Sequence, residues 1–173
     1  MYFLGYCYLA IVMIAVLCAL EKSVYKTIPD LDVYDKNRDA YTFDLSIPII
    51  AHPPCQQWSR LREFSKENKK EKELAFFCLE KIHQNGGVLE HPAGSSFFKE
   101  AGIKPTLSID QAWFGYPARK RTYLYFYGCK PLAFPLTFDL ATKKVENMGQ
   151  VARSVTTLQF AEYLISCVNQ VLR

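Results

Sequence analysis

Short apolar runs, each closed by proline or glycine, mark the predicted strands of this chain. The run Ile47–Ala51 is continuously apolar, which is the pattern of a strand buried on both faces. Val88–Pro92 predicts the next strand, and proline ends both strands because it has no N–H to donate to a sheet. The aromatic segment Thr122–Tyr127 predicts a further strand that stops at Gly128, and Leu31–Asp35 predicts a short one.

A period of three to four residues predicts two amphipathic helices. The first runs from about Lys70 to Gln84, and Asn85-Gly86-Gly87 supplies a left-handed C-cap. The second is capped by Thr156 or Thr157 and runs to about Val171. Between the strands we expect a turn or two of helix in 21–28 and in 97–101, a connection over 103–110, and mostly loop over 131–147.

The N-terminal segment Tyr2–Leu20 carries no charged residue, so two structures compete for it. Its length is enough for a transmembrane helix. Its β-branched content over Val12–Leu20 instead favours the buried first strand of the domain, with 1–12 as an apolar extension and Met13 as an alternative start. We favour the strand and a cytoplasmic protein, and a membrane-anchored form is the alternative.

Composition limits the class of protein. At 173 residues, half of them hydrophobic, the chain is expected to form one domain over 1–173. A formal net charge of +4 permits an anionic partner such as nucleic acid without requiring one. The six cysteines are scattered with no CxxC pair, so we expect neither a metal site nor a disulfide framework, and a reducing setting.

The order of the elements predicts an α/β fold, a Rossmann-like three-layer domain with a mostly parallel sheet. In such sheets ligands bind in a crevice outside the carboxyl ends of the strands. Cys55 follows the strand 47–51 directly after Pro53-Pro54, and Glu90 lies near the end of another short strand. Both side chains are therefore expected at one crevice.

Three strings at these strand ends resemble those of DNA (cytosine-5) methyltransferases. They are the Pro-Pro-Cys-Gln-Gln-Trp-Ser loop 53–59, the Leu-Glu-His-Pro strand 89–92, and Arg119-Lys-Arg121 before a strand that ends in glycine. The likeness covers about 45–128 in the same order. The strings also resemble those of small phage-type proteins of uncharacterised role. The resemblance implies a truncated fold of the methyltransferase type.

The resemblance implies an enzyme that modifies cytosine at C5, in DNA or as a nucleotide. Cys55 would be the nucleophile that attacks C6, and Glu90 a protonated acid at ring nitrogen N3. Arg119 and Arg121 would complete the catalytic group, holding a carbonyl or phosphate and favouring the thiolate. A base in duplex DNA would first have to be flipped out.

Further residues are predicted around this group. Asp32 and Asp35, at the end of the second strand, are expected to bind ribose hydroxyls of S-adenosylmethionine, or else to be solvated or capping acids. The predicted contacts to substrate or nucleic acid are His52, Gln57, Ser59, Arg60, Arg62, His91, Gln111 and Lys120. The two histidines are alternatively structural.

The strings depart from the family in one respect that matters for the donor. No glycine occurs between Gly5 and Gly86, whereas the family receives S-adenosylmethionine on a glycine-rich loop. Glu90 is also followed by His-Pro instead of Asn-Val. A non-catalytic module that binds a nucleotide or nucleic acid is therefore the alternative function.

Overall fold

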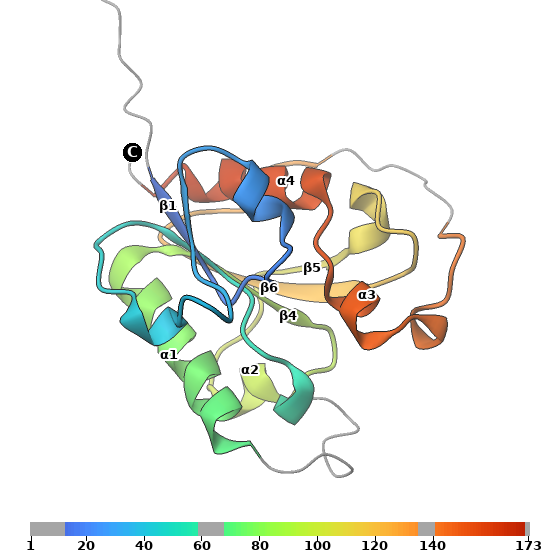
Figure 1. Ribbon diagram of the computed structural model, residues 1–173, viewed down its shortest axis with the longest axis horizontal. Helices are drawn as coiled ribbons and strands as arrows, with labels where there is room; N and C mark the ends of the chain where they lie inside the picture. Colours follow the sequence, from blue (N-terminus) through green and yellow to red (C-terminus); the bar gives the residue numbers. More distant parts are fainter. Residues whose placement is uncertain (1–12, 59–67, 135–140, 172–173) are drawn as a thin grey trace, which may run out of the picture.

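The computed structural model describes residues 13–58, 68–134 and 141–171, and a six-stranded mixed sheet forms their centre (Figure 1). The strand order is β2-β1-β3-β4-β6-β5. The strands are β1 (Ile14–Leu17), β2 (Leu31–Val33), β3 (Ile49–Ala51), β4 (Gly87–Pro92), β5 (Leu107–Asp110) and β6 (Arg121–Tyr127). Strands β1 to β4 pair in parallel, and β6 runs antiparallel to both its neighbours, so the sheet is mostly parallel.

Helices cover both faces of this sheet (Figure 1). The α-helices are α1 (Lys69–Asn85), α2 (Phe97–Glu100), α3 (Gln150–Ser154) and α4 (Leu158–Val168). The 3-10 turns are η1 (Val24–Thr27), η2 (Ala40–Thr42), η3 (Gln56–Trp58), η5 (Gln111–Phe114) and η6 (Val145–Asn147). Helices α1 and α2 pack on one face, and α4 packs on the other with η1.

Alternation along the strands distributes the core between these faces. Ala15 and Leu17 of β1 point to α1, whereas Val16 points to α4. In β4, Val88 points to α4 and Leu89 to α1. Strands β1 and β3 are apolar at every position because both of their faces are buried, which is why they read as continuous apolar runs.

The junction between α1 and β4 requires glycine for steric reasons. Gly86 and Gly87 have φ angles of 77° and 139°. A Cβ on Gly87 would lie 1.9 Å from the carbonyl oxygen of Ile49 in the neighbouring strand. The Gly-Gly pair therefore both ends α1 and lets β3 approach β4, which sets the register of the two strands that carry the candidate site.

The structure confirms most of the predicted elements and corrects others. The connection expected over 103–110 contains β5, which was missed because it is an edge strand with one buried residue, Ile109. Helix α3 was also missed, since its Val151 is 76% exposed and it shows no apolar face. The last helix ends at Val168, three residues before the predicted end.

The N-terminal segment forms a strand as far as the structure describes it. Ile14–Leu17 is fully buried between β2 and β3, so these residues are not part of a helix. Residues 1–12 lie outside the described residues, and so does that part of the predicted transmembrane helix. Within the described ranges, every helix is too short or too polar to cross a bilayer.

Candidate functional site

The chain leaves β1 and β3 toward opposite faces of the sheet. After β1, η1 places Tyr25 in the core under α4. After β3, η3 places Trp58 in the core under α1, against Phe97. Where neighbouring parallel strands diverge in this way, the sheet opens at their carboxyl ends, and this is where ligands bind in open α/β sheets.

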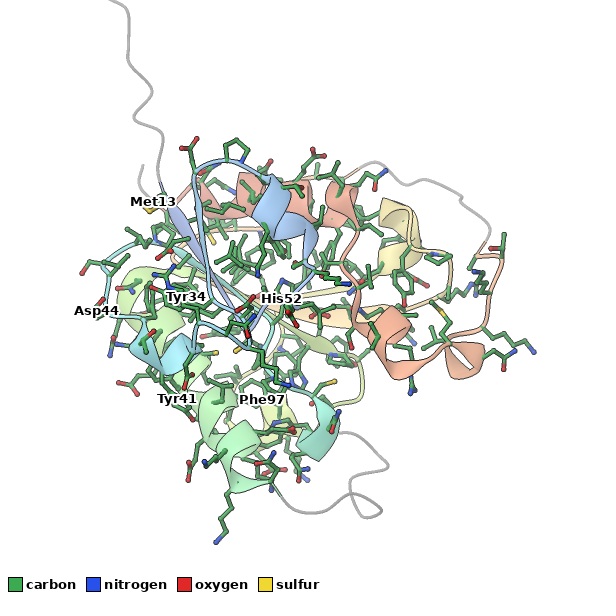
Figure 2. All side chains as sticks on the ribbon, viewed as in Figure 1. Met13, Tyr34, Tyr41, Asp44, His52 and Phe97 are labelled. Atoms are coloured by element: carbon green, nitrogen blue, oxygen red, sulfur yellow. The ribbon has the colours of Figure 1, made fainter. Side chains whose placement is uncertain are left out.

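His52 and Glu90 meet at this opening because of the strand register. Ala51 pairs with Leu89, so the next residues, His52 and Glu90, lie side by side and point to the same face. Nδ1 of His52 lies 3.1 Å from Oε2 of Glu90. Its Nε2 lies 3.0 Å from the hydroxyl of the buried Tyr25. Figure 2 shows His52 near the middle of the molecule.

Gln111 and Thr122 extend this network on the other side of Glu90. Nε2 of Gln111 lies 3.2 Å from Oε1 of Glu90 and 2.9 Å from Oγ1 of Thr122. Asp110 fixes the turn that carries Gln111, because its Oδ1 accepts from the backbone N–H of Ala112 at 3.1 Å and of Lys120 at 3.0 Å. The result is one chain of hydrogen bonds from Tyr25 to Thr122.

Glu90 is ionised within this network. Burial by itself would raise the pKa of Glu90, but the hydrogen bond from His52 and, after it, the charge of Lys120 lower that pKa to about 2. With Glu90 ionised, its carboxylate accepts a hydrogen bond from Nδ1–H of His52, and Nε2 of the same ring shares a hydrogen bond with the Tyr25 hydroxyl. The expectation of a protonated Glu90 is therefore not met in the free protein.

Cys55 is partly exposed just beyond β3. Burial raises the pKa of its thiol, the charge of Glu90 raises it further, and Lys120 acts in the opposite direction. The thiol is thus protonated at neutral pH, not the thiolate that we expected. Lys120 is the cation whose charge acts on both Cys55 and Glu90, whereas Arg119 and Arg121 are exposed and their catalytic role remains a prediction.

His91 points away from this network. It follows Glu90 in β4, so its ring lies on the α1 face, where it is 0% exposed and packs on Phe97 with ring centroids 5.2 Å apart. Burial lowers the pKa of His91 to about 4, against the raising effects of the Glu90 charge and the Pro54 carbonyl. The structure therefore places His91 in the core as a neutral ring, not at the crevice.

The acids predicted to bind ribose are engaged by basic side chains. Asp32 pairs with Arg38. Asp35 pairs with Lys26, and its Oδ1 accepts from the backbone N–H of Asn37 at 2.8 Å and of Arg38 at 3.0 Å. The hydrogen bond from Lys26 contributes most to lowering the pKa of Asp35 to about 2, with the two backbone N–H groups adding to it.

These contacts do not fit the methyl donor that the resemblance implies. A donor would need the Asp35 carboxylate free for its ribose and close backbone approach after β1. The Lys26 ion pair occupies that carboxylate. Cys18 and Ala19 follow β1 without a glycine, and the Ala19 N–H donates to the Tyr34 carbonyl at 2.9 Å, so this segment stays against β2. We therefore derive no step through S-adenosylmethionine.

The remaining predicted contacts divide by location. Gln111 and Lys120 lie at the network, and Gln57 is buried in η3. Ser59, Arg60 and Arg62 lie outside the described residues. Sequence reasoning missed Tyr25, Asp110 and Thr122. An acid before Gln111 is the usual signal of a side-chain-capped turn and would have indicated Asp110. Tyr25 lies far along the chain from the three segments that resemble the methyltransferase motifs, and no sequence pattern marked it as a site residue.

We predict that Tyr25→Phe lowers the free energy of unfolding by about 1–2 kcal/mol, because it removes the hydrogen bond between the buried Tyr25 hydroxyl and Nε2 of His52. Urea denaturation measures this change. Tyr127→Phe is the matched control, since Tyr127 is 46% exposed and its variant should stay within about 0.5 kcal/mol of the wild type. Equal losses in the two variants would contradict the importance of the Tyr25–His52 bond.

Comparison with known proteins does not identify a family for this chain. The chain matches no protein-family model, and a search of curated proteins finds no significant match. Within the ranges that the structure describes, no three metal-ligating side chains gather in one place.

Proposed function

We propose that the chain is a pyrimidine-modifying enzyme of the cytosine-5 methyltransferase type, acting on DNA or nucleotides through Cys55. The parallel strands β1 to β4, covered by helices on both faces, support a Rossmann-like three-layer fold, shortened relative to that type. The observation that carries the proposal is the juxtaposition at the strand ends. Cys55 is partly exposed and close enough to Glu90 for the carboxylate charge to raise the pKa of its thiol. Hydrogen bonds from His52 and Gln111 hold the Glu90 carboxylate in place.

The arrangement provides the groups that nucleophilic attack on a pyrimidine needs. The Cys55 sulfur bonds to C6, the ring double bond moves from C5–C6 to C4–C5, and the electron pair displaced from the C4–N3 double bond takes a proton at N3. Because Glu90 is ionised, its carboxylate takes the proton that the Cys55 thiol gives up on attack and delivers it to N3, while the hydrogen bond from His52 holds the carboxylate in place. Lys120 favours the thiolate form of Cys55 once substrate binds.

Addition at C6 makes C5 nucleophilic whatever group is finally attached there. In deuterated water C5 then takes a deuteron and releases its own proton, and expulsion of the thiolate restores the ring. Replacement of the C5 proton by deuterium therefore reports the covalent step. No methyl donor is needed for this exchange, so it can be measured although the residues after β1 do not fit S-adenosylmethionine.

The test is to incubate the protein in deuterated water with dCMP or with a cytosine-containing oligonucleotide, and to measure the mass of the recovered base. We expect a gain of deuterium at C5, faster than in a matched incubation without protein. If neither substrate gains deuterium above that background, the proposed enzyme activity is wrong.

A second candidate function is a module that binds a nucleotide or nucleic acid without catalysis. The ionised Glu90 and protonated Cys55 of the free protein favour it, because both are in the unreactive state for attack on C6. A thermal-shift experiment separates the two candidates. Stabilisation by nucleotides with no C5 exchange would support binding alone, and stabilisation by S-adenosylmethionine would contradict our conclusion about the donor.

A further inference from the structure

Two cysteine side chains that are distant in the sequence meet on the α1 face of the sheet. Cys18 follows β1 and Cys78 lies in α1, 60 positions later, yet their Sγ atoms are 3.6 Å apart. Cys78 is 0% exposed, whereas Cys18 is partly exposed, and both thiols are free. No spacing motif in the sequence indicated this contact, because it depends on how α1 packs against the end of β1.

An unusual backbone conformation brings Cys18 to this face. Val16 points to α4 and Leu17 points to α1, so continued alternation would direct the Cys18 side chain to α4. Cys18 instead has a φ angle of 62°, in the left-handed region that favours glycine, and its side chain packs with Leu17 on the α1 face. A conformation that residues with a Cβ seldom adopt therefore places the Cys18 sulfur against Cys78.

The two thiols differ in their access to solvent. The hydrogen bond shared with Cys18, together with burial, raises the pKa of Cys78 well above its ordinary value, so Cys78 is a protonated thiol in the core. Cys18 lies at the edge of the same core and is partly exposed. A small oxidant in solution therefore meets Cys18 first, and Cys78 lies within reach as the thiol that resolves the oxidised sulfur.

We infer that Cys18 and Cys78 are a reversible redox pair, which a hydroperoxide oxidises to a disulfide and a thiol reductant restores. This inference is independent of the proposed function, because neither Cys55 nor Glu90 takes part. It is compatible with the reducing setting expected from the scattered cysteines, since disulfides that form in such a setting are usually transient and redox-sensing.

The oxidation proceeds in two steps. The Cys18 sulfur gives up its proton and attacks one oxygen of hydrogen peroxide, the O–O bond breaks, and the other oxygen leaves as water with that proton. The Cys78 sulfur then attacks the sulfur of the Cys18 sulfenic acid, the S–O bond breaks, and the hydroxyl leaves as a second water with the Cys78 proton. The two sulfurs are oxidised by two electrons in total, and the peroxide is reduced by two.

The disulfide would restrain one side of the opening at the strand ends. Leu17, directly before Cys18, accepts a hydrogen bond through its carbonyl from the backbone N–H of His52 at 3.0 Å. A covalent bond from Cys18 to Cys78 would tie the end of β1 to α1, and with it the strand end against which the His52 backbone is held.

The test is to treat the full chain with hydrogen peroxide, to block the remaining thiols with N-ethylmaleimide in denaturant, and to map the peptides by mass spectrometry. We expect a linked Cys18–Cys78 peptide that dithiothreitol removes. Cys129→Ser is the matched control, because Cys129 is also a partly exposed thiol but its Sγ donates to the Gly87 carbonyl. The Cys129→Ser protein should form the same linked peptide in the same yield as the wild type.

Two variants assign the roles of the two sulfurs. Cys18→Ser, at a partly exposed position, should lose the linked peptide and leave Cys78 reduced. Cys78→Ala should leave Cys18 as a sulfenic acid, which dimedone traps, because the resolving thiol is missing. The peptide map of the wild type needs no variant, so the inference remains testable even if a change at the buried Cys78 prevents folding.

The oxidised protein should also unfold at a higher urea concentration than the reduced one, because the bond closes a loop of about 60 residues in the unfolded chain. Hydrogen exchange of the His52 amide should be slower in the oxidised form, since the strand end that holds it is restrained. Peroxide that links Cys18 to another cysteine, or that oxidises Cys129 while Cys18 and Cys78 stay unlinked, overturns the inference. A lower urea midpoint in the oxidised form would overturn it as well.

Discussion

Cys55→Ser is expected to lower the rate of cytosine C5 exchange by about a thousandfold or more, because a serine hydroxyl is a poor nucleophile at neutral pH. Substrate binding should persist, since the change removes one sulfur atom from a partly exposed side chain. The measurement is deuterium gain at C5, together with binding of dCMP by thermal shift.

The control for this variant is Cys129→Ser. Cys129 is also a partly exposed free thiol, but its Sγ donates to the Gly87 carbonyl at 3.5 Å, away from the His52–Glu90 network. This variant should exchange at the wild-type rate. A Cys55→Ser protein that exchanges as fast as the wild type would show that no covalent step at Cys55 takes place.

The exchange rate of the wild type should also rise with pH. Burial and the Glu90 charge raise the pKa of Cys55, so the reactive thiolate is the minor form at neutral pH. Its fraction grows about tenfold for each pH unit below that pKa. A rate that is constant between neutral and moderately alkaline pH would contradict attack by the Cys55 thiolate.

Glu90→Ala is expected to lower the free energy of unfolding by about 3–5 kcal/mol, because it removes the buried acceptor shared by two donors. Nδ1–H of His52 and Nε2–H of Gln111 would each lose a hydrogen bond where water does not replace it. Urea denaturation measures the loss. Glu80→Ala, on the exposed face of α1, should change stability by less than about 0.5 kcal/mol.

Because Glu90 is ionised in the folded protein, its contribution to the free energy of unfolding depends on pH. Its pKa is about 2 in the folded protein and near 4.5 without the fold, so the folded carboxyl holds its proton less tightly. That difference stabilises the protein by about 3 kcal/mol above pH 4.5 and is lost as the pH falls through about 2.

Glu90→Gln isolates this contribution, because glutamine keeps the shape and has no proton to release. The stability difference between the wild type and Glu90→Gln should therefore shrink as the pH is lowered from about 4.5 toward 2. A difference that stays constant over this range would mean that Glu90 is not held ionised by its neighbours.

The sequence predicted the strands that carry the candidate site because their environment leaves a local signature. β3 is buried on both faces, so its apolar run was visible, and the prolines that close β3 and β4 marked their carboxyl ends. From these ends we predicted that Cys55 and Glu90 face one opening, and the charge of Glu90 does act on the Cys55 thiol. Edge strand β5 and polar helix α3 have no such signature.

The protonation states were not predictable from the strings, because they depend on tertiary neighbours. The resemblance to the cytosine-5 methyltransferase motifs implied that Cys55 is a thiolate and that Glu90 is protonated. Burial of Cys55 and the placement of His52 against Glu90 produce the opposite states in the free protein. His91 was equally ambiguous in the sequence, and only strand alternation from Glu90 shows that it points into the core.

The insertion of β6 between β4 and β5 has a consequence for biosynthesis. The hydrogen-bonded chain from Tyr25 to Thr122 draws on residues nearly a hundred positions apart, and the turn that carries Gln111 is held by Lys120 and β6. A nascent polypeptide therefore cannot complete this network until β6 has left the ribosome. Until then the Glu90 carboxylate lacks the hydrogen bond that Gln111 donates to it in the folded protein.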